Sequence, residues 1–324
     1  MLRSETAAEP ARTAAALRGL RAYQEAPRVP RPAAMPAVAE RHGAALRDYG
    51  GRGPPVVFVP SLINPPHVLD LAADRSLLRW LAGRGRRVLL LDWGEQVAGR
   101  AALDVAGHVG DILVPLVRAL DVPPALVGYC LGGTMAIGAA ACMPVERLAT
   151  IAAPWRFAGY TADARAKLAA LWRGAGPLAE RLGVLPMEVL QTAFWALDPG
   201  RSVAKFERFA SLRDEPARAA FVALEDWAND GPPLPLPAAR ELFELFYAAD
   251  ATGTGAWLAR PEALPCPQLH IVSTSDRIVP AASAPGGGER LELAQGHVGM
   301  VVGSAAEAML WEPLARWLSP ARAT

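Results

Sequence analysis

Cysteine and lysine are scarce in this chain of 324 residues. Its three cysteines, at positions 130, 142 and 266, have neither the spacing of metal ligands nor the pattern of a disulfide framework. Such sparse cysteines fit a reducing cytoplasm, in which a catalytic thiol would also persist. Lys167 and Lys205 are the two lysines, so arginine carries most of the positive charge. We therefore expect a cytoplasmic protein with no bound metal.

An excess of charge of either sign is also missing. The 33 basic and 32 acidic residues leave a formal net charge of +1, which argues against nucleic acid as a partner. The N-terminus lacks the apolar stretch of a signal peptide, and Glu5 and Glu9 argue against a transit peptide. The uncharged run from 122 to 145 is long enough to span a membrane. However, prolines near both ends and a glycine-rich turn in its middle favour a buried strand and helix, so we expect no transmembrane span.

Short apolar segments alternate with helical patterns in the first half of the chain and again near its end. The expected strands are 44–49, 55–59, 87–91, 126–129, 148–152, 268–273 and 290–294. The expected helices are 14–23, 76–83, 105–120, 134–141 and 305–318. Continuously apolar strands that alternate with helices are typical of a parallel sheet buried on both faces. The predicted fold class is therefore α/β, with a mostly parallel sheet and helices on both of its faces.

The alternation stops between residues 157 and 255. Trp, Phe and Leu recur there at helical spacing, and we find no good strand in this segment. Three parts follow from this pattern. We predict an N-terminal arm over 1–40 (a helix and a Pro-rich linker), an α/β core over 41–156 and 256–324, and a helical cap over 157–255 inserted in that core.

The segment 125–134 reads A-L-V-G-Y-C-L-G-G-T, an apolar strand that runs into a glycine-flanked turn. Gly128 lies two residues before Cys130 and Gly132 two residues after it. This is the spacing of the nucleophile elbow, in which a strained strand-to-helix turn presents one side chain above the sheet. Glycines are needed there because the backbones of the strand and the helix nearly touch. Cys130 is therefore our candidate nucleophile.

Two further residues lie at the expected ends of late strands. In the α/β-hydrolase arrangement the chain order is nucleophile, acid, histidine. Asp276 follows the strand that ends at Ser273, and His297 follows the last strand. In this arrangement His297 would accept the proton of Cys130, and Asp276 would orient the imidazole and stabilise its charged form. The sequence thus predicts a catalytic triad of Cys130, Asp276 and His297.

The triad also needs donors for the oxyanion of a tetrahedral intermediate. One is expected to be the backbone N–H of Leu131, directly after the nucleophile, and the other an N–H near Leu62 or Ile63 in the loop after strand 55–59. The remaining cysteines, Cys142 and Cys266, are interpreted as packing residues of the core.

Several motifs of the chain, in order, resemble those of the polyhydroxyalkanoate (PHA) synthases, and especially the short class III catalytic subunit. The similar segments are P-S-L-I-N-P-P-H-V-L-D-L (60–71), D-R-S-L-L-R-W-L (74–81), L-L-L-D-W-G (89–94), F-W-A-L-D-P (194–199), K-F (205–206), L-E-D-W-A-N-D (224–230), S-D-R-I-V-P (275–280) and G-H-V-G (296–299). The resemblance covers roughly residues 40–318.

The resemblance implies an acyltransferase that polymerises 3-hydroxyacyl-CoA through an acyl group on Cys130 and releases CoA. It implies no cofactor besides the CoA thioester that is the substrate. The expected partners are 3-hydroxyacyl-CoA, a separate synthase subunit or a second copy of the chain, and the surface of a PHA granule. Two alternatives use the same residues: a cysteine hydrolase (an intracellular PHA depolymerase or an acyl-CoA thioesterase), and a catalytically idle paralogue of the synthases.

Overall fold

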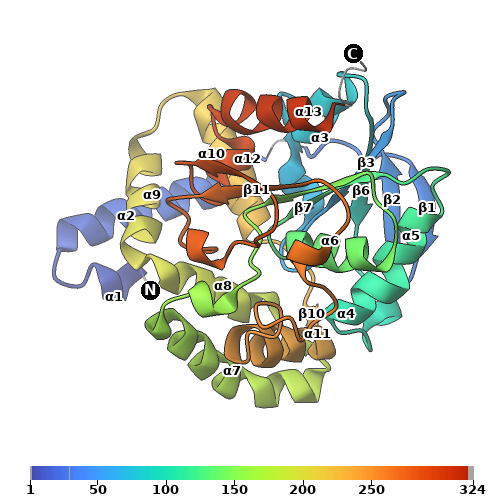
Figure 1. The fold of residues 1–324 in the computed structure, drawn as a ribbon. Helices are drawn as coiled ribbons and strands as arrows, with labels where there is room; N and C mark the ends of the chain where they lie inside the picture. The colour runs from blue at the N-terminus through green and yellow to red at the C-terminus, as the bar shows by residue number, and fades with distance from the viewer. Residues whose placement is uncertain (1, 29, 320–324) are drawn as a thin grey trace.

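An eight-stranded sheet forms the centre of the computed structural model, which describes residues 2–28 and 30–319 (Figure 1). In spatial order the strands are β1 (Ala37–Arg41), β2 (Ala44–Asp48), β6 (Arg87–Asp92), β3 (Pro55–Val59), β7 (Ala125–Tyr129), β8 (Arg147–Ile151), β11 (Gln268–Ser273) and β12 (Glu289–Leu293). The six strands from β6 to β12 are parallel, whereas β1 and β2 pair antiparallel. This mostly parallel sheet confirms the predicted fold class.

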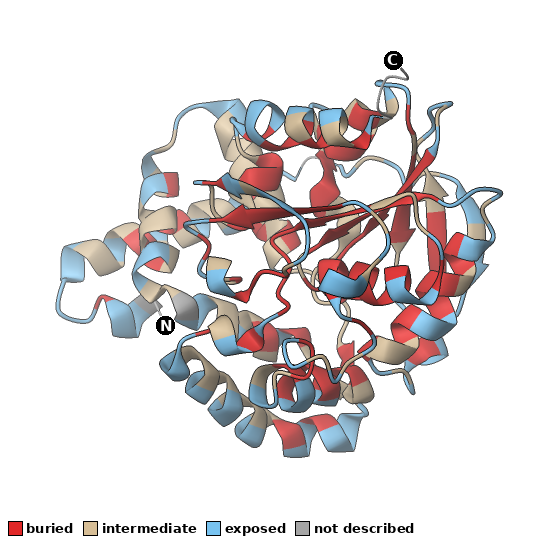
Figure 2. Cartoon of the chain, in the orientation of Figure 1, coloured by how far each residue is buried: buried red, intermediate tan, exposed pale blue. Residues whose placement is uncertain are grey.

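The central strands are buried on both faces because each face packs against its own layer of helices (Figure 2). Along β3, Val57 and Val59 face one apolar cluster, and Val56 and Phe58 face the other, as the two-residue period of a strand requires. The helices of the first face are α4 (Val105–Gly107), the π-helix η3 (His108–Leu113), α5 (Val114–Arg118) and α6 (Leu131–Cys142). Those of the second are α3 (Leu77–Ala82), α12 (Gly299–Val302), the π-helix η8 (Glu307–Trp311) and α13 (Glu312–Leu318).

The segment between β8 and β11 is mainly helical, and in the view of Figure 1 its helices lie below the sheet and to its left. They are α7 (Ala162–Leu182), α8 (Met187–Leu197), α9 (Pro199–Ser211), α10 (Glu215–Ala228), α11 (Leu236–Arg240) and the π-helix η5 (Glu241–Ala248). The expectation of no strand was wrong, because β9 (Val184–Leu185) pairs with β10 (Leu234–Pro235). Two-residue strands so far apart in the chain leave no periodic pattern in the sequence.

The N-terminal region is more structured than the predicted arm. It begins with α1 (Leu2–Glu5) and α2 (Pro10–Glu25), and α2 lies along α9, with Gly19 against the backbone of Phe206 (Figure 1). Strand β1 falls where a Pro-rich linker was expected. It pairs with β2 through His42 and Gly43, whose φ angles of 51° and 80° form a tight hairpin turn. Because β1 is exposed along most of its length, it lacks the apolar pattern that identified the other strands.

Several short elements complete the chain. They are η1 (Pro66–Leu69), β4 (Asp70–Ala72), β5 (Arg75–Ser76), η2 (Ala98–Arg100), η4 (Phe157–Gly159), η6 (Pro261–Ala263) and η7 (Ala281–Ser283). Within the described residues, we find no helix with both the length and the apolar character to cross a membrane.

Candidate active site

Cys130 occupies a sharp turn between β7 and α6. Its φ of 55° and ψ of −131° are unusual for a residue with a side chain. Its backbone N–H donates to the carbonyl of Ile151 on the neighbouring strand, at 2.9 Å. A Cβ at Gly128 would lie 2.4 Å from the Cα of Gly133, and one at Gly132 would lie 2.1 Å from the carbonyl oxygen of Val59. The flanking glycines are therefore required by backbone contact, and they keep the turn in its strained conformation.

Asp276 and His297 meet above the ends of β11 and β12. Nδ1 of His297 lies 2.6 Å from Oδ2 of Asp276, and both residues are buried. The other carboxylate oxygen, Oδ1, accepts the backbone N–H groups of Ile278 at 2.7 Å and Val279 at 3.1 Å. All of these partners hold the carboxylate in one orientation, with its second oxygen directed at the imidazole.

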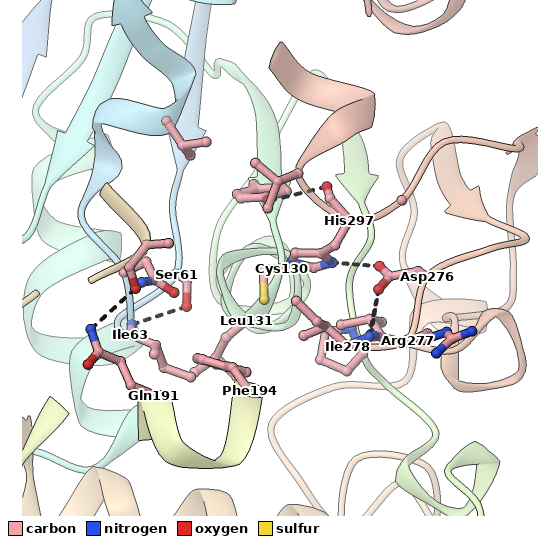
Figure 3. Close-up of a pocket in the computed structure, with 18 of the residues that line it drawn as sticks. Ser61, Ile63, Cys130, Leu131, Gln191, Phe194, Asp276, Arg277, Ile278 and His297 are labelled. Atoms are coloured by element: carbon pink, nitrogen blue, oxygen red, sulfur yellow. Dashed lines mark hydrogen bonds and ion pairs between the residues drawn. The ribbon is translucent and has the colours of Figure 1, made fainter. Parts of the chain in front are cut away.

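The Cys130 sulfur lies next to the His297 ring, on the side away from Asp276 (Figure 3). Burial alone would lower the pKa of His297, but the charges of Asp276 and Cys130 and hydrogen bonding to both raise it to about 10. The Tyr129 hydroxyl adds support by donating to the backbone carbonyl of His297 at 3.3 Å. The three residues proposed from the sequence are thus brought together in the order thiol, imidazole, carboxylate.

A cavity of about 430 Å³ opens above these residues. Cys130, Asp276 and His297 line it from the sheet side, and helices α8, α9 and α10 line it from the other. Most of its wall is apolar, and the helical side contributes Phe194, Trp195, Leu224, Trp227 and Ala228 among others. The site therefore combines a small polar cluster at its base with an apolar chamber, the usual character of a small-molecule site.

The three residues named for the oxyanion donors have different surroundings. Leu131 and Ile63 line the cavity, whereas Leu62 is buried in the core and is not among the lining residues. The backbone N–H of Ile63 donates to Oγ of Ser61 at 3.1 Å. Ser61 also lines the cavity and was not singled out from the sequence. The N–H of Leu131 belongs to the first turn of α6, where helix donors have no partner within the helix.

The other cysteines lie elsewhere. Cys266 is half-buried and packs against the core, as expected. Cys142 is exposed at the last position of α6, so its interpretation as a core residue was wrong. The apolar run around it belongs to a helix whose other residues are buried up to Ala140, which made its neighbourhood look buried throughout.

Ion pairs that were not predicted from the sequence surround the helical side of the cavity. Asp198, at the start of α9, pairs with Arg277 at 2.5 Å. Lys205 of α9 pairs with Glu225 of α10 at 2.6 Å. Arg201 lies between Asp198 and Lys205 in the sequence of α9, and its side chain is exposed. The paired residues lie in the motifs that carry the family resemblance, but no local pattern indicates the pairing, because α9, α10 and the loop after β11 are far apart in the chain.

No protein-family model matches the chain. It is 29% identical to the poly(3-hydroxyalkanoate) polymerase subunit PhaC of Haloferax mediterranei, over 82% of this chain and 58% of that protein. The PhaC subunit of Haloarcula marismortui is 28% identical over 87% of this chain and 64% of its own length. That of Allochromatium vinosum is 27% identical over 82% of this chain and 80% of its own length. The chain thus spans less than two thirds of the first two of these proteins.

Solved structures agree on the fold. A hydrolase from Pseudomonas aeruginosa has a TM-score of 0.53 at 19% identity, covering 86% of this chain and 94% of its own. An esterase from Thermogutta terrifontis also has a TM-score of 0.53, at 18% identity, covering 90% and 98% of the two chains. The chain is therefore a sequence relative of the poly(3-hydroxyalkanoate) polymerase subunits and has the α/β-hydrolase fold, as its motifs predicted.

Proposed function

We propose that this chain is a PHA synthase-like acyltransferase that polymerises 3-hydroxyacyl units from CoA thioesters through an acyl group on Cys130. The observation that carries the proposal is the contact of His297 with Asp276 at 2.6 Å, next to a cysteine at the elbow and at the base of an apolar cavity. The polymerase names of the sequence relatives support the choice of acyl transfer.

Acylation of Cys130 begins the proposed cycle. A protonated His297 beside the sulfur stabilises the thiolate, which is the nucleophilic form of cysteine. The thiolate attacks the thioester carbonyl, and the N–H of Leu131 donates to the oxyanion that forms. When the carbon–sulfur bond to CoA breaks, His297 delivers its proton to the departing thiolate of CoA. One thioester is exchanged for another, so this step is nearly balanced in free energy.

Chain extension follows by attack of a hydroxyl on the Cys130 thioester. The hydroxyl belongs to another 3-hydroxyacyl unit, and the neutral His297 left by the first step takes its proton. The new ester bond forms as the bond to the Cys130 sulfur breaks. Asp276 keeps Nδ1 of His297 protonated throughout, so that the other ring nitrogen faces the reacting atoms.

The helical segment over 157–255 acts, in this proposal, as a cap that excludes water. Water and a hydroxyl compete for the same acyl enzyme, so transfer needs a chamber that favours the organic nucleophile. The apolar wall from α8 and α10, with Phe194 and Trp227, suits an acyl chain in this way. If water reaches Cys130 instead, the same residues give a cysteine hydrolase.

A single incubation separates the alternatives. The purified full chain is mixed with 3-hydroxybutyryl-CoA, and free CoA and polymer are measured together. CoA released with polymer supports the synthase; CoA released with free 3-hydroxybutyrate identifies a hydrolase. Release of neither, with and without a PHA synthase partner subunit, would indicate an idle paralogue and contradict the proposal.

The covalent step has its own test. We expect Cys130→Ala to lower CoA release by at least about a thousandfold, because a covalent mechanism cannot proceed without its nucleophile. Cys142→Ala is the matched control, since this exposed cysteine lies outside the cavity, and it should keep wild-type activity. Full CoA release by Cys130→Ala would rule out the acyl enzyme.

A further inference from the structure

Three cationic side chains line the same cavity as the candidate triad. Arg201 and Lys205 come from α9, and Arg277 directly follows Asp276. Arg201 and Lys205 are four residues apart, so both lie on one face of the helix. The net charge of the chain is only +1, and Lys205 is one of its two lysines. They reach one cavity from two elements that are far apart in the sequence, α9 and the loop after β11.

Arg201 and Arg277 lie at the solvent end of the cavity, whereas Lys205 is only partly exposed and pairs with the buried Glu225. The Asp276 side chain has 0% of its surface exposed, whereas that of Arg277 has 65%. Figure 3 shows the guanidinium of Arg277 beyond Asp276, directed away from the Cys130 sulfur. Arg201 is also exposed. The buried candidate triad and the exposed Arg201 and Arg277, which we call the cationic rim, thus differ in their exposure to solvent.

The acidic groups near the rim leave part of its positive charge unpaired. Asp198 pairs with Arg277, and Glu225 pairs with Lys205 at 2.6 Å. Both carboxylate oxygens of Asp198 are engaged, because Oδ1 accepts the backbone N–H of Arg201 at 3.0 Å. Among the described residues, the side chain of Arg201 has no ion-pair partner. It is therefore the cation that is ready to receive an anion from solution.

We propose that Arg201 and Arg277 bind the phosphate groups of the CoA part of the substrate, while its thioester reaches Cys130. This inference rests on the function proposed above. The pantetheine arm of a CoA thioester separates a multiply charged nucleotide from the reacting carbonyl, so a thioester at Cys130 would leave its phosphates toward the solvent end of the cavity, where Arg201 and Arg277 are exposed. Arginine binds phosphate through paired N–H donors, and a cationic mouth raises the local concentration of an anionic substrate.

The test compares two thioesters that differ only in the nucleotide end. Rates are measured with 3-hydroxybutyryl-CoA and with 3-hydroxybutyryl-N-acetylcysteamine, which carries no phosphate. We expect Arg201→Gln to raise KM for the CoA thioester about tenfold, the effect of losing one charge-assisted hydrogen bond, with kcat nearly unchanged. KM for the truncated thioester should stay the same. Added salt should shrink the difference between wild type and variant.

Arg208→Gln is the matched control, because Arg208 is an exposed arginine of the same helix that does not line the cavity. It removes the same charge and should leave both KM values unchanged. Equal effects of Arg201→Gln on the two thioesters, or no effect on either, would overturn the proposal. So would an effect of Arg208→Gln as large as that of Arg201→Gln, since this would indicate a general charge effect.

The rim can also be tested if the protein turns over neither thioester. Binding of CoA and of pantetheine is then measured by calorimetry for the wild type and Arg201→Gln. If the wild type binds CoA more tightly than pantetheine and Arg201→Gln loses this difference, phosphate binding at the rim is supported although the proposed reaction has failed. Equal affinity of the wild type for the two molecules, or no binding of CoA, would overturn the proposal that the rim binds phosphate.

Discussion

The two sides of the cavity are held in different ways. On the sheet side the residues are held by hydrogen bonds of the backbone. The N–H of Cys130 donates to the carbonyl of Ile151, and the carboxylate of Asp276 accepts two backbone N–H groups. On the helical side, side-chain pairs such as Lys205–Glu225 link one element to the next. Backbone contacts fix atoms more closely than pairs of long, flexible side chains. In the proposed function, the sheet side therefore carries the reacting groups, whereas the helical side contacts the rest of the substrate.

Apart from loss of the nucleophile itself, the largest effect is expected on the sheet side, from Asp276→Asn. Loss of the carboxylate should lower the rate of CoA release by roughly a hundredfold to ten-thousandfold, as in other triads whose acid is replaced by its amide. Asp163→Asn, which removes an exposed carboxylate of α7, is the control and should change the rate little. A rate within twofold of wild type for Asp276→Asn would mean that the acid does not act through His297.

The same variant should change how stability depends on pH. Because the pKa of His297 is raised from 6.5 to about 10, protonation stabilises the folded chain. This contribution is complete below pH 6.5 and is lost as the pH rises through about 10. Asp276→Asn removes a charge that raises this pKa, so the decline over that range should be smaller. Denaturation midpoints at pH 6.5, 8 and 10 measure it; identical declines for the two proteins would contradict the expectation.

The next largest effect should be a loss of folding stability caused by Gly132→Ala. Its new Cβ would lie 2.1 Å from the carbonyl oxygen of Val59 and 2.5 Å from that of Pro60, so the turn or β3 must shift. We expect a loss of about 3 kcal/mol in the free energy of unfolding, at the upper end for overpacking in a core. Urea denaturation followed by circular dichroism measures the loss. An unchanged midpoint would show that the elbow is looser than its contacts indicate.

The smallest effect should have the opposite sign and lie on the helical side. Gly174 is exposed in the middle of α7, and a Cβ there would meet no atom within 4 Å. Alanine costs less conformational entropy than glycine in a helix, so Gly174→Ala should stabilise the chain by about 0.5–1 kcal/mol. The same denaturation experiment tests it beside Gly132→Ala. A destabilisation would contradict the open surroundings of Gly174 and the helix propensity on which the prediction rests.

Much of the sheet could be predicted because its central strands are continuously apolar. The expected strands 55–59 and 268–273 coincide with β3 and β11. Strand β1 and the pair β9–β10 were missed, since one is mostly exposed and the others have two residues each. Their pairing depends on tight turns and on contacts distant in sequence, which hydrophobic periodicity does not report.

The candidate triad could be located because each member follows a strand that the pattern identified. Cys130, Asp276 and His297 could be placed at one edge of the sheet before their distances were known, since parallel strands end on the same side. Ser61 and Tyr129 have no comparable signal, because a serine in a loop and a tyrosine in a strand are common. Their contacts with Ile63 and His297 appear only in the folded chain.

The sequence by itself determined the α/β core and the order of the three candidate residues, because apolar periodicity and glycine spacing act locally along the chain. The tertiary structure alone decided the cavity and its cationic rim. Arg201 and Arg277 meet the same opening only because α9 folds back over the loop after β11. Such proximity depends on how distant elements pack, and no local pattern of residues encodes it.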